Sequence, residues 1–308
     1  MVQGSFREHA ELELELADWV GAEASLLTLS AFAANIGLIP AIADADSLIV
    51  SDALNHASIV DGCRLARARV VVTPHLQLEA VEEALRQHTG GAPAWVIVEG
   101  LFSMDGDCPD LAELRGLCDR YGAGLVVDEA HSLGVFGPSG AGRAAAQGVQ
   151  ADVLVAGLGK AVGAQGGFLA CSTDLRKWLW NRARSFVFST APSPVLCRLV
   201  LEQVRRARAA EAARQRLAAR SHELRSALAE RGLPALAGAV GPIVPVVLGS
   251  NERTLAAMQE LRRRGILAQA IRPPTVPLGG ARLRLTAHAD WPDDAVARIV
   301  AALEVACA

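Results

Sequence analysis

The sequence has 308 residues, of which 51% are hydrophobic, enough for a large buried core, and we expect one large domain followed by a smaller one. The formal net charge of −3 lacks the basic excess of a polyanion-binding protein and argues against nucleic acid as a partner. No apolar run is long enough to span a bilayer, and the glutamates between Glu8 and Glu15 do not suit a signal peptide, so we expect neither feature.

The six cysteines are scattered along the chain, without a C-x-x-C pair or a nearby pair of histidines. They are Cys63, Cys108, Cys118, Cys171, Cys197 and Cys307. This pattern predicts small core residues in a reduced, cytoplasmic protein rather than metal ligands or disulfides.

The first two thirds of the sequence alternate between strand-like and helix-like segments. Leu12, Leu16 and Trp19 have helical spacing, although Leu14 leaves the choice between helix and strand open, and Leu26–Leu29 is a short apolar run. The predicted helices are Ala31–Ile42, Ala57–Ala66, Leu76–Gln87, Asp110–Tyr121 and Thr173–Ala183, and the predicted strands are Leu48–Val50, Arg69–Val72, Trp95–Glu99, Leu125–Asp128, Val153–Ala156 and Phe168–Cys171. The alternation predicts an α/β fold with a mostly parallel central sheet and helices on both faces.

The pattern changes at Pro194. A long helix is expected over Val195–Arg231, ending at Gly232 and Pro234. Strands at Ile243–Leu248, Ile266–Ile271 and Ala281–Thr286 follow, with one helix between Asn251 and Gly265 and another after Pro292. We therefore expect a large domain at 1–193, and the linking helix with a small α+β domain at 194–308.

Polar residues stand just after the predicted parallel strands, where ligands bind in such sheets. Ser103 follows one strand, Asp128 and His131 follow the next, and Lys160 follows a third. We expect these four side chains to converge along one rim.

Lys160 lies on a glycine-rich turn and is one of two lysines in the chain. The glycines around it are Gly157, Gly159, Gly163, Gly166 and Gly167. Because an amine can lose its proton and form a Schiff base, which a guanidinium cannot, this position suits a reactive lysine.

A lysine, a strand-end carboxylate and an imidazole together fit the chemistry of pyridoxal 5′-phosphate. Lys160 would hold the cofactor aldehyde as a Schiff base, Asp128 would keep the pyridine nitrogen protonated, and His56 could stack on the ring. Structural roles are the alternative: His131 could cap a turn, His56 could be a satisfied loop histidine, and Asp128 could belong to a helix cap. Each alternative explains one residue, but none explains their expected meeting on one rim.

Four motifs resemble those of the α-oxoamine synthases, pyridoxal-phosphate enzymes with the fold of aspartate aminotransferase (fold type I). The motifs are Glu99-Gly-Leu-Phe-Ser-Met-Asp-Gly-Asp, Asp128-Glu-Ala-His-Ser-Leu-Gly, Gly159-Lys160-Ala-x-Gly and Phe188-Ser-Thr. The family condenses an amino acid with an acyl thioester, releases CO2 and forms an α-amino ketone. The resemblance covers nearly the whole chain, and the runs that begin at Ile271 and Ala281 are most similar to the branch that serves biotin synthesis. That branch implies L-alanine and a pimeloyl thioester of coenzyme A or of a carrier protein.

The resemblance also implies site residues. It implies catalytic roles for Lys160, His131 and Asp128. Cofactor contacts are implied for Ala31, Phe32, His56, Ser103, Asp128, His131, Gly157, Lys160, Ser189 and Thr190, and substrate contacts for His56, Thr275 and Arg284. Since Ser189 and Thr190 would reach the phosphate in a neighbouring subunit, a homodimer with shared active sites is expected; no metal is expected.

Other members of the family remain alternatives. One pairs serine with a long acyl chain, as in serine palmitoyltransferase, which the Asp128-Glu-Ala-His-Ser-Leu-Gly run favours; another pairs glycine with an acetyl group. A third alternative is a catalytically inactive partner subunit. Family members carry an N-terminal segment with an Asn-Tyr motif ahead of the point where this sequence starts, so we expect that segment to be missing here.

Overall fold

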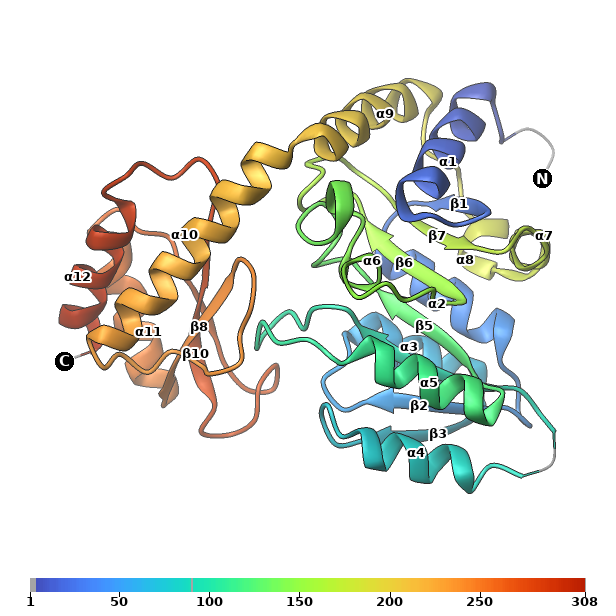
Figure 1. Cartoon of the computed structure of the whole chain (residues 1–308), viewed down its shortest axis with the longest axis horizontal. Helices are drawn as coiled ribbons and strands as arrows, with labels where there is room; N and C mark the ends of the chain where they lie inside the picture. Colours follow the sequence, from blue (N-terminus) through green and yellow to red (C-terminus); the bar gives the residue numbers. More distant parts are fainter. Residues whose placement is uncertain (1–3, 90, 308) are drawn as a thin grey trace. The chain divides into compact units, whose positions relative to one another are not determined.

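A computed structural model describes residues 4–89 and 91–307, which form two compact units (Figure 1). The first unit comprises residues 4–101 together with Pro109–Ala210, and the second comprises Phe102–Cys108 together with residues 211–307. The sequence prediction had placed the domain boundary between residues 193 and 194.

The first unit is built on a seven-stranded sheet with the order β1-β7-β6-β5-β4-β2-β3. The strands are β1 (Ala24–Thr28), β2 (Leu48–Asp52), β3 (Arg69–Thr73), β4 (Ala94–Glu99), β5 (Gly124–Asp128), β6 (Val153–Gly157) and β7 (Gly167–Cys171). Strands β2 to β6 pair in parallel, and β7 pairs antiparallel with both β6 and β1. The predicted mostly parallel sheet is confirmed, and the carboxyl ends of its parallel strands lie along one edge.

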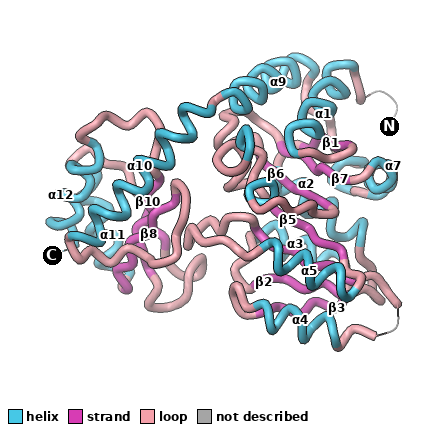
Figure 2. The backbone as a smooth tube through the Cα atoms, viewed as in Figure 1, coloured by secondary structure: helices cyan, strands magenta, loops and turns pink. Residues whose placement is uncertain are grey.

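Helices cover both faces of this sheet (Figures 1 and 2). They are α1 (Arg7–Val20), α2 (Ala31–Ile42), α3 (Ala57–Ala66), α4 (Leu78–Arg86), α5 (Leu111–Tyr121), α6 (Arg143–Ala146), α7 (Thr173–Arg182), α8 (Arg184–Val187) and α9 (Pro194–Ala209). Apolar side chains of α2, α3 and α7 form one buried cluster with alternate residues of the strands, such as Ile97 and Val126. The alternation follows from the two-residue period of a strand, which sends successive side chains to opposite faces.

The ends of the helices follow their capping residues. Ser30 accepts a hydrogen bond from the Ala33 N–H at the start of α2, and Asp110 does the same for Glu113 at the start of α5. The segment around Leu14, left open by the sequence, is the helix α1: Leu12 and Leu16 are buried, whereas Leu14 is 71% exposed.

The expected single helix over Val195–Arg231 is two helices, α9 and α10 (Glu211–Glu230). Ala210 between them has φ −82° and ψ 40°, outside the helical range, so the chain of backbone hydrogen bonds is interrupted there. The Ala- and Arg-rich composition continues through the break, so no residue there predicts the end of a helix.

The second unit is an α+β layer. Its antiparallel sheet has the order β8-β10-β9, made of β8 (Ile243–Gly249), β9 (Gln269–Ile271) and β10 (Ala281–Thr286). Helices α10, α11 (Asn251–Arg263) and α12 (Ala295–Cys307) bury a cluster that includes Leu224, Val246 and Leu303 against it. The strand predicted over Ile266–Ile271 is shorter, since the Ile266 N–H still bonds to the Leu261 carbonyl at the end of α11.

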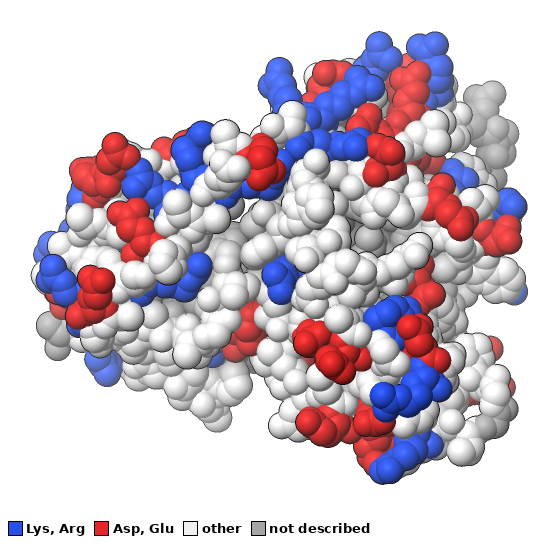
Figure 3. Space-filling model, viewed as in Figure 1, with Lys and Arg blue, Asp and Glu red and all other residues white. Residues whose placement is uncertain are grey.

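The surface carries charges of both signs. Figure 3 shows acidic and basic side chains side by side over α1 and α9, where Arg208 pairs with Glu15 and Asp18. Within residues 4–89 and 91–307, no helix combines the length and the apolar character needed to cross a bilayer.

Candidate active site

A cavity of about 490 Å³ lies in the first unit, at the carboxyl edge of the sheet. Seven of the predicted site residues line it: Ala31, Phe32, His56, Asp128, His131, Gly157 and Lys160. They come from the ends of strands β5 and β6 and from the starts of helices α2 and α3. The cavity therefore brings together residues that are far apart in the sequence, such as Ala31 and Lys160, which are separated by 129 positions.

Lys160 lies on the turn that joins β6 to β7. The turn is closed by backbone hydrogen bonds from Leu158 to Gly166 and from Ala164 to Leu158. Gly163 and Gly166 have φ values of +67° and +129°, which only glycine adopts without strain. The glycines thus turn the chain back into the sheet while the lysine side chain stays at the cavity.

Asp128 is 4% exposed and holds two hydrogen bonds. Its Oδ2 accepts one from the Asn35 amide at 2.7 Å, and its Oδ1 accepts one from the Ala130 N–H at 2.9 Å. Burial raises the pKa of Asp128, while these two bonds and the charges of Lys160 and His56 act in the opposite direction. The two donors therefore stabilise an ionised carboxylate deep in the protein.

His56 is the N-terminal cap of α3 and belongs to the same network. Its Nδ1 accepts a hydrogen bond from the Ser58 N–H at 3.2 Å and lies 2.8 Å from the Ser58 hydroxyl. The Asn35 amide also donates to that hydroxyl, at 2.9 Å. A chain of polar contacts therefore runs from His56 through Ser58 and Asn35 to Asp128, and the Phe32 ring meets the imidazole edge-on, with centroids 6.4 Å apart.

The start of helix α2 faces the cavity with Ser30, Ala31 and Phe32. The first N–H groups of a helix lack partners within it and favour anions, so this end is suited to a phosphate. Gly167 permits the arrangement, because a Cβ at that position would lie 2.3 Å from the Ser30 carbonyl carbon and the Ala31 nitrogen. The β7 backbone can approach the helix start only as glycine.

Two further carboxyl groups are buried beside Asp128. Glu129 accepts hydrogen bonds from the Arg143 and Ala144 N–H groups at the start of α6 and from the Ser132 hydroxyl. Glu99 ends β4 in register with Asp128, lines the cavity, and is 2% exposed. Burial raises the pKa of both groups.

Three predicted site residues belong to the second unit. Arg284 donates from Nε to the Ser103 carbonyl at 2.6 Å, and burial lowers its pKa. Thr275 is exposed, and its N–H bonds to the Arg272 carbonyl. The loop with Ser103 joins this unit because the Gly106 carbonyl accepts a hydrogen bond from the Val240 N–H.

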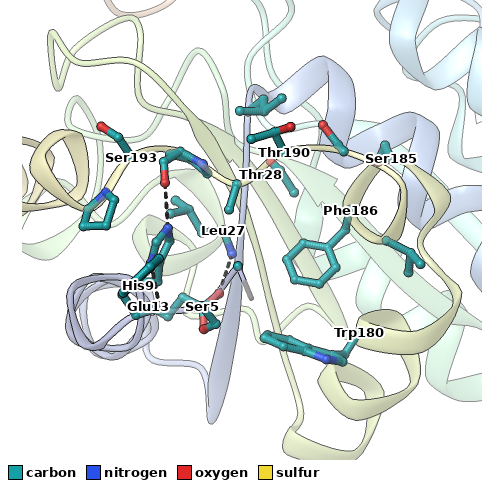
Figure 4. A pocket seen from close by; sticks show the side chains of 18 of the residues that line it. Ser5, His9, Glu13, Leu27, Thr28, Trp180, Ser185, Phe186, Thr190 and Ser193 are labelled. Atoms are coloured by element: carbon teal, nitrogen blue, oxygen red, sulfur yellow. Dashed lines mark hydrogen bonds between the residues drawn. The ribbon is translucent and has the colours of Figure 1, made fainter. Parts of the chain in front are cut away.

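Ser189 and Thr190 line a separate cavity of about 810 Å³ in the first unit (Figure 4). Figure 4 shows Trp180 and Phe186 on one side of it and His9 and Glu13 on the other. Glu13 accepts hydrogen bonds from the Leu27 N–H and from Arg176, and His9 Nε2 lies 2.7 Å from the Pro192 carbonyl. Because Ser189 and Thr190 line this second cavity, they are not part of the cavity that holds Lys160 in the same chain.

Three further residues of the site were not predicted from the sequence: Asn35, Ser58 and Glu99. Asn35 had a signal, since it is an amide in the middle of an otherwise apolar helix and is fully buried. Glu99 had one as well, as the charged last residue of a buried strand. Ser58 carried no such signal.

The chain is similar to known proteins of one family over nearly its whole length. The model of the family "Aminotransferase class I and II" matches residues 3–303. Curated proteins named 8-amino-7-oxononanoate synthase are similar: one from Anaeromyxobacter dehalogenans is 45% identical, over 98% of this chain and 76% of its own length, and one from Geobacter sulfurreducens is 42% identical, over 98% and 78%.

Among solved structures, serine palmitoyltransferase from S. paucimobilis with a bound PLP–myriocin aldimine has a TM-score of 0.95 at 29% identity, covering 99% of this chain and 78% of that one. The family match spans nearly the whole sequence, and the curated relatives are 38–45% identical to it. The chain therefore belongs to the aminotransferase class I and II family and, within it, to the α-oxoamine synthases.

Proposed function

We propose that the protein condenses L-alanine with a pimeloyl thioester, with release of CO2, in the step of biotin synthesis that is carried out by 8-amino-7-oxononanoate synthase. The observation that carries the proposal is the single cavity lined by Lys160, Asp128, His131 and His56. Support also comes from the curated relatives that bear this enzyme name at 38–45% identity.

The residues of the cavity fit pyridoxal 5′-phosphate. The Lys160 amine would bind its aldehyde carbon, and the buried Asp128 carboxylate would pair with its ring nitrogen. The N–H groups at the start of α2, at Ala31 and Phe32, would hold its phosphate. Gly157 lines the same cavity, and a Cβ there would meet the Ala31 Cβ at 3.4 Å, an ordinary contact distance.

The bound cofactor would supply an electron-withdrawing ring that stabilises negative charge on the α-carbon of the amino acid. Lys160, as a free amine beside that carbon, would take its proton. His131 would hold a proton for the oxygen of the acyl group, and Asp128 would keep the ring nitrogen protonated. His56 would cover one face of the ring.

Substrate and partner roles extend the proposal to the remaining predicted residues. Arg284 would bind the carboxylate of the amino acid, a task suited to its planar guanidinium. Thr275 would line the substrate site, and Ser103 would contact the cofactor. Ser189 and Thr190 would serve the phosphate in the second subunit of a homodimer, in keeping with their place outside the cavity of Lys160. The cytoplasmic setting stays a prediction from the cysteine pattern.

A serine palmitoyltransferase-like reaction is the second candidate. It is favoured by the TM-scores of 0.95 to solved serine palmitoyltransferases, compared with 0.86 to an 8-amino-7-oxononanoate synthase from Francisella tularensis that is 24% identical. The two candidates differ in both substrates, so they are separated by substrate choice.

The cofactor assignment is tested by absorbance. Purified protein mixed with pyridoxal phosphate should gain a visible band, and borohydride should fix the cofactor to the chain. Lys160→Ala should abolish both effects, whereas Lys177→Ala, at an exposed lysine paired with Asp174, should change neither. Borohydride fixation that persists in Lys160→Ala would refute the assignment.

The substrates are tested with the same band. Glycine, L-alanine and L-serine are added in turn, and each amino acid that perturbs the spectrum is then offered pimeloyl and palmitoyl thioesters, with CO2 release and product mass as readouts. Consumption of L-alanine with the pimeloyl thioester supports the proposal. Consumption of L-serine with the palmitoyl thioester alone refutes it in favour of the second candidate.

A further inference from the structure

We propose that Glu99 is a positioning residue of the active site, whose buried carboxyl group fixes the tautomer and the orientation of His131. The inference rests on the proposed function, because His131 matters to turnover only if the cavity binds cofactor and substrate. The experiment that tests it nevertheless measures the tautomer of the His131 ring, which can be observed without following turnover.

Glu99 occupies a position that leaves it few partners other than His131. It is the last residue of β4, and its N–H donates to the Asn55 amide oxygen at 3.2 Å. Its Oε2 lies 3.7 Å from His131 Nδ1, and its Oε1 is buried without a hydrogen-bond partner among the described residues. The carboxyl group therefore has unused hydrogen-bonding capacity at the wall of the cavity.

The pairing of β4 with β5 places two carboxyl groups side by side. Glu99 and Asp128 are direct neighbours in the register of the parallel strands. Two adjacent buried carboxylates repel each other, so one of them keeps a proton, as in paired carboxyl sites of enzymes. Which one keeps it depends on the hydrogen bonds offered to each.

The surroundings assign the proton to Glu99. Asp128 accepts bonds from the Asn35 amide and the Ala130 N–H, which favour its ionised form. Burial raises the pKa of Glu99 well above its usual value, the charges of Asp128 and Asp52 raise it further, and the nearby His56 backbone N–H and the charge of Lys160 act against this. The contacts therefore favour the ionised form at Asp128 and the protonated form at Glu99.

A protonated Glu99 can donate to His131 Nδ1. A contraction of about 0.7 Å would bring the observed 3.7 Å to the length of a hydrogen bond. With Nδ1 as an acceptor, the neutral ring carries its proton on Nε2 and can offer it to a substrate oxygen. The carboxyl group thus selects the tautomer that the proposed acid role of His131 requires.

The test is nitrogen-15 NMR of labelled histidine in the cofactor-loaded protein, with the His131 signals identified by their loss in His131→Gln. The wild-type protein should show a bare Nδ1 and a protonated Nε2 at His131. Glu99→Leu should give a mixture of both tautomers and a kcat about 10- to 100-fold lower, with KM for the amino acid changed less than twofold. Glu99→Gln, whose amide can also donate to Nδ1, should restore the wild-type tautomer.

The matched control is Asp52→Asn. Asp52 ends the neighbouring strand β2, and its Oδ1 bonds His75 Nδ1 at 2.8 Å, so this change should move the signals of His75. Asp52 acts on Glu99 only through its charge, so the His131 tautomer should change far less than in Glu99→Leu. An unchanged His131 tautomer in Glu99→Leu would overturn the inference, even if kcat falls.

If Glu99→Leu does not fold, the pH dependence decides. The wild-type tautomer should be lost at high pH, when Glu99 gives up its proton, but should persist in Glu99→Gln, because an amide does not titrate. A tautomer that responds to pH in the same way in both proteins overturns the inference. If Lys160→Ala keeps its borohydride-fixed cofactor, the proposed function fails, whatever the tautomer shows.

Discussion

Replacing Asn35 with alanine should lower the free energy of unfolding of the first unit, and this loss of stability should grow as the pH rises. The side chain is fully buried and donates two hydrogen bonds, at 2.7 Å to the Asp128 carboxylate and at 2.9 Å to the Ser58 hydroxyl. A bond to a charged group contributes about 1.5–3 kcal/mol and a neutral one about 0.5–1.5 kcal/mol. Because Ser58 keeps its contact with His56, the Asp128 bond dominates, and we expect a total loss of about 2–4 kcal/mol.

The pH dependence follows from the sign of the Asp128 shift. Burial already holds the folded-state pKa of Asp128 above the 3.8 of an exposed aspartate, and losing the Asn35 donor raises it further. An acid with a raised folded-state pKa costs stability as pH rises, because the unfolded chain releases the proton first. Below the wild-type pKa, Asp128 is protonated in both proteins, so the difference in stability between the wild-type protein and Asn35→Ala should shrink. Above the pKa that Asp128 has in Asn35→Ala, this difference in stability should reach its full size.

The measurement is the thermal midpoint of unfolding, followed by circular dichroism from acidic to mildly alkaline pH. For a unit of roughly 200 residues, the expected loss lowers the midpoint by about 5–15 °C near neutral pH. Asn181→Ala is the control, since this exposed amide makes one bond, to the Lys177 carbonyl. If Asn35→Ala lowers the midpoint no more than the control does, or by an amount that does not depend on pH, the stabilising hydrogen bond from Asn35 to Asp128 is contradicted.

Three further changes probe other parts of the site. Gly167→Ala should weaken cofactor binding in an absorbance titration more than the Gly148→Ala control, because its Cβ would lie 2.3 Å from the backbone at the start of α2. Asp128→Asn should retain bound cofactor but lower kcat by several orders of magnitude, since the cofactor ring loses its charged partner; wild-type rates in a steady-state assay would exclude that role. Glu129→Ala should lower the midpoint of unfolding by several degrees, as the N–H groups of Arg143 and Ala144 lose their acceptor, whereas an unchanged midpoint would mean that α6 does not depend on it.

The catalytic candidates could be predicted from the sequence because their signals are local. Lys160 follows a buried strand on a glycine turn, and Asp128 ends the neighbouring strand, so the parallel-sheet rule alone brings them to one edge. The supporting residues could not be predicted in this way. Asn35 and Asp128 are 93 positions apart, and their contact depends on how α2 lies across the sheet.

The alternating strands and helices, the turn that carries Lys160 and the family motifs are therefore properties of the sequence itself, since each depends on residues a few positions apart. Only the tertiary structure decided that Glu99 stands beside Asp128, that Asn35 serves the same carboxylate, and that the long arginine-rich helix breaks at Ala210. Strand register and helix packing set these contacts, and both depend on distant segments being folded together.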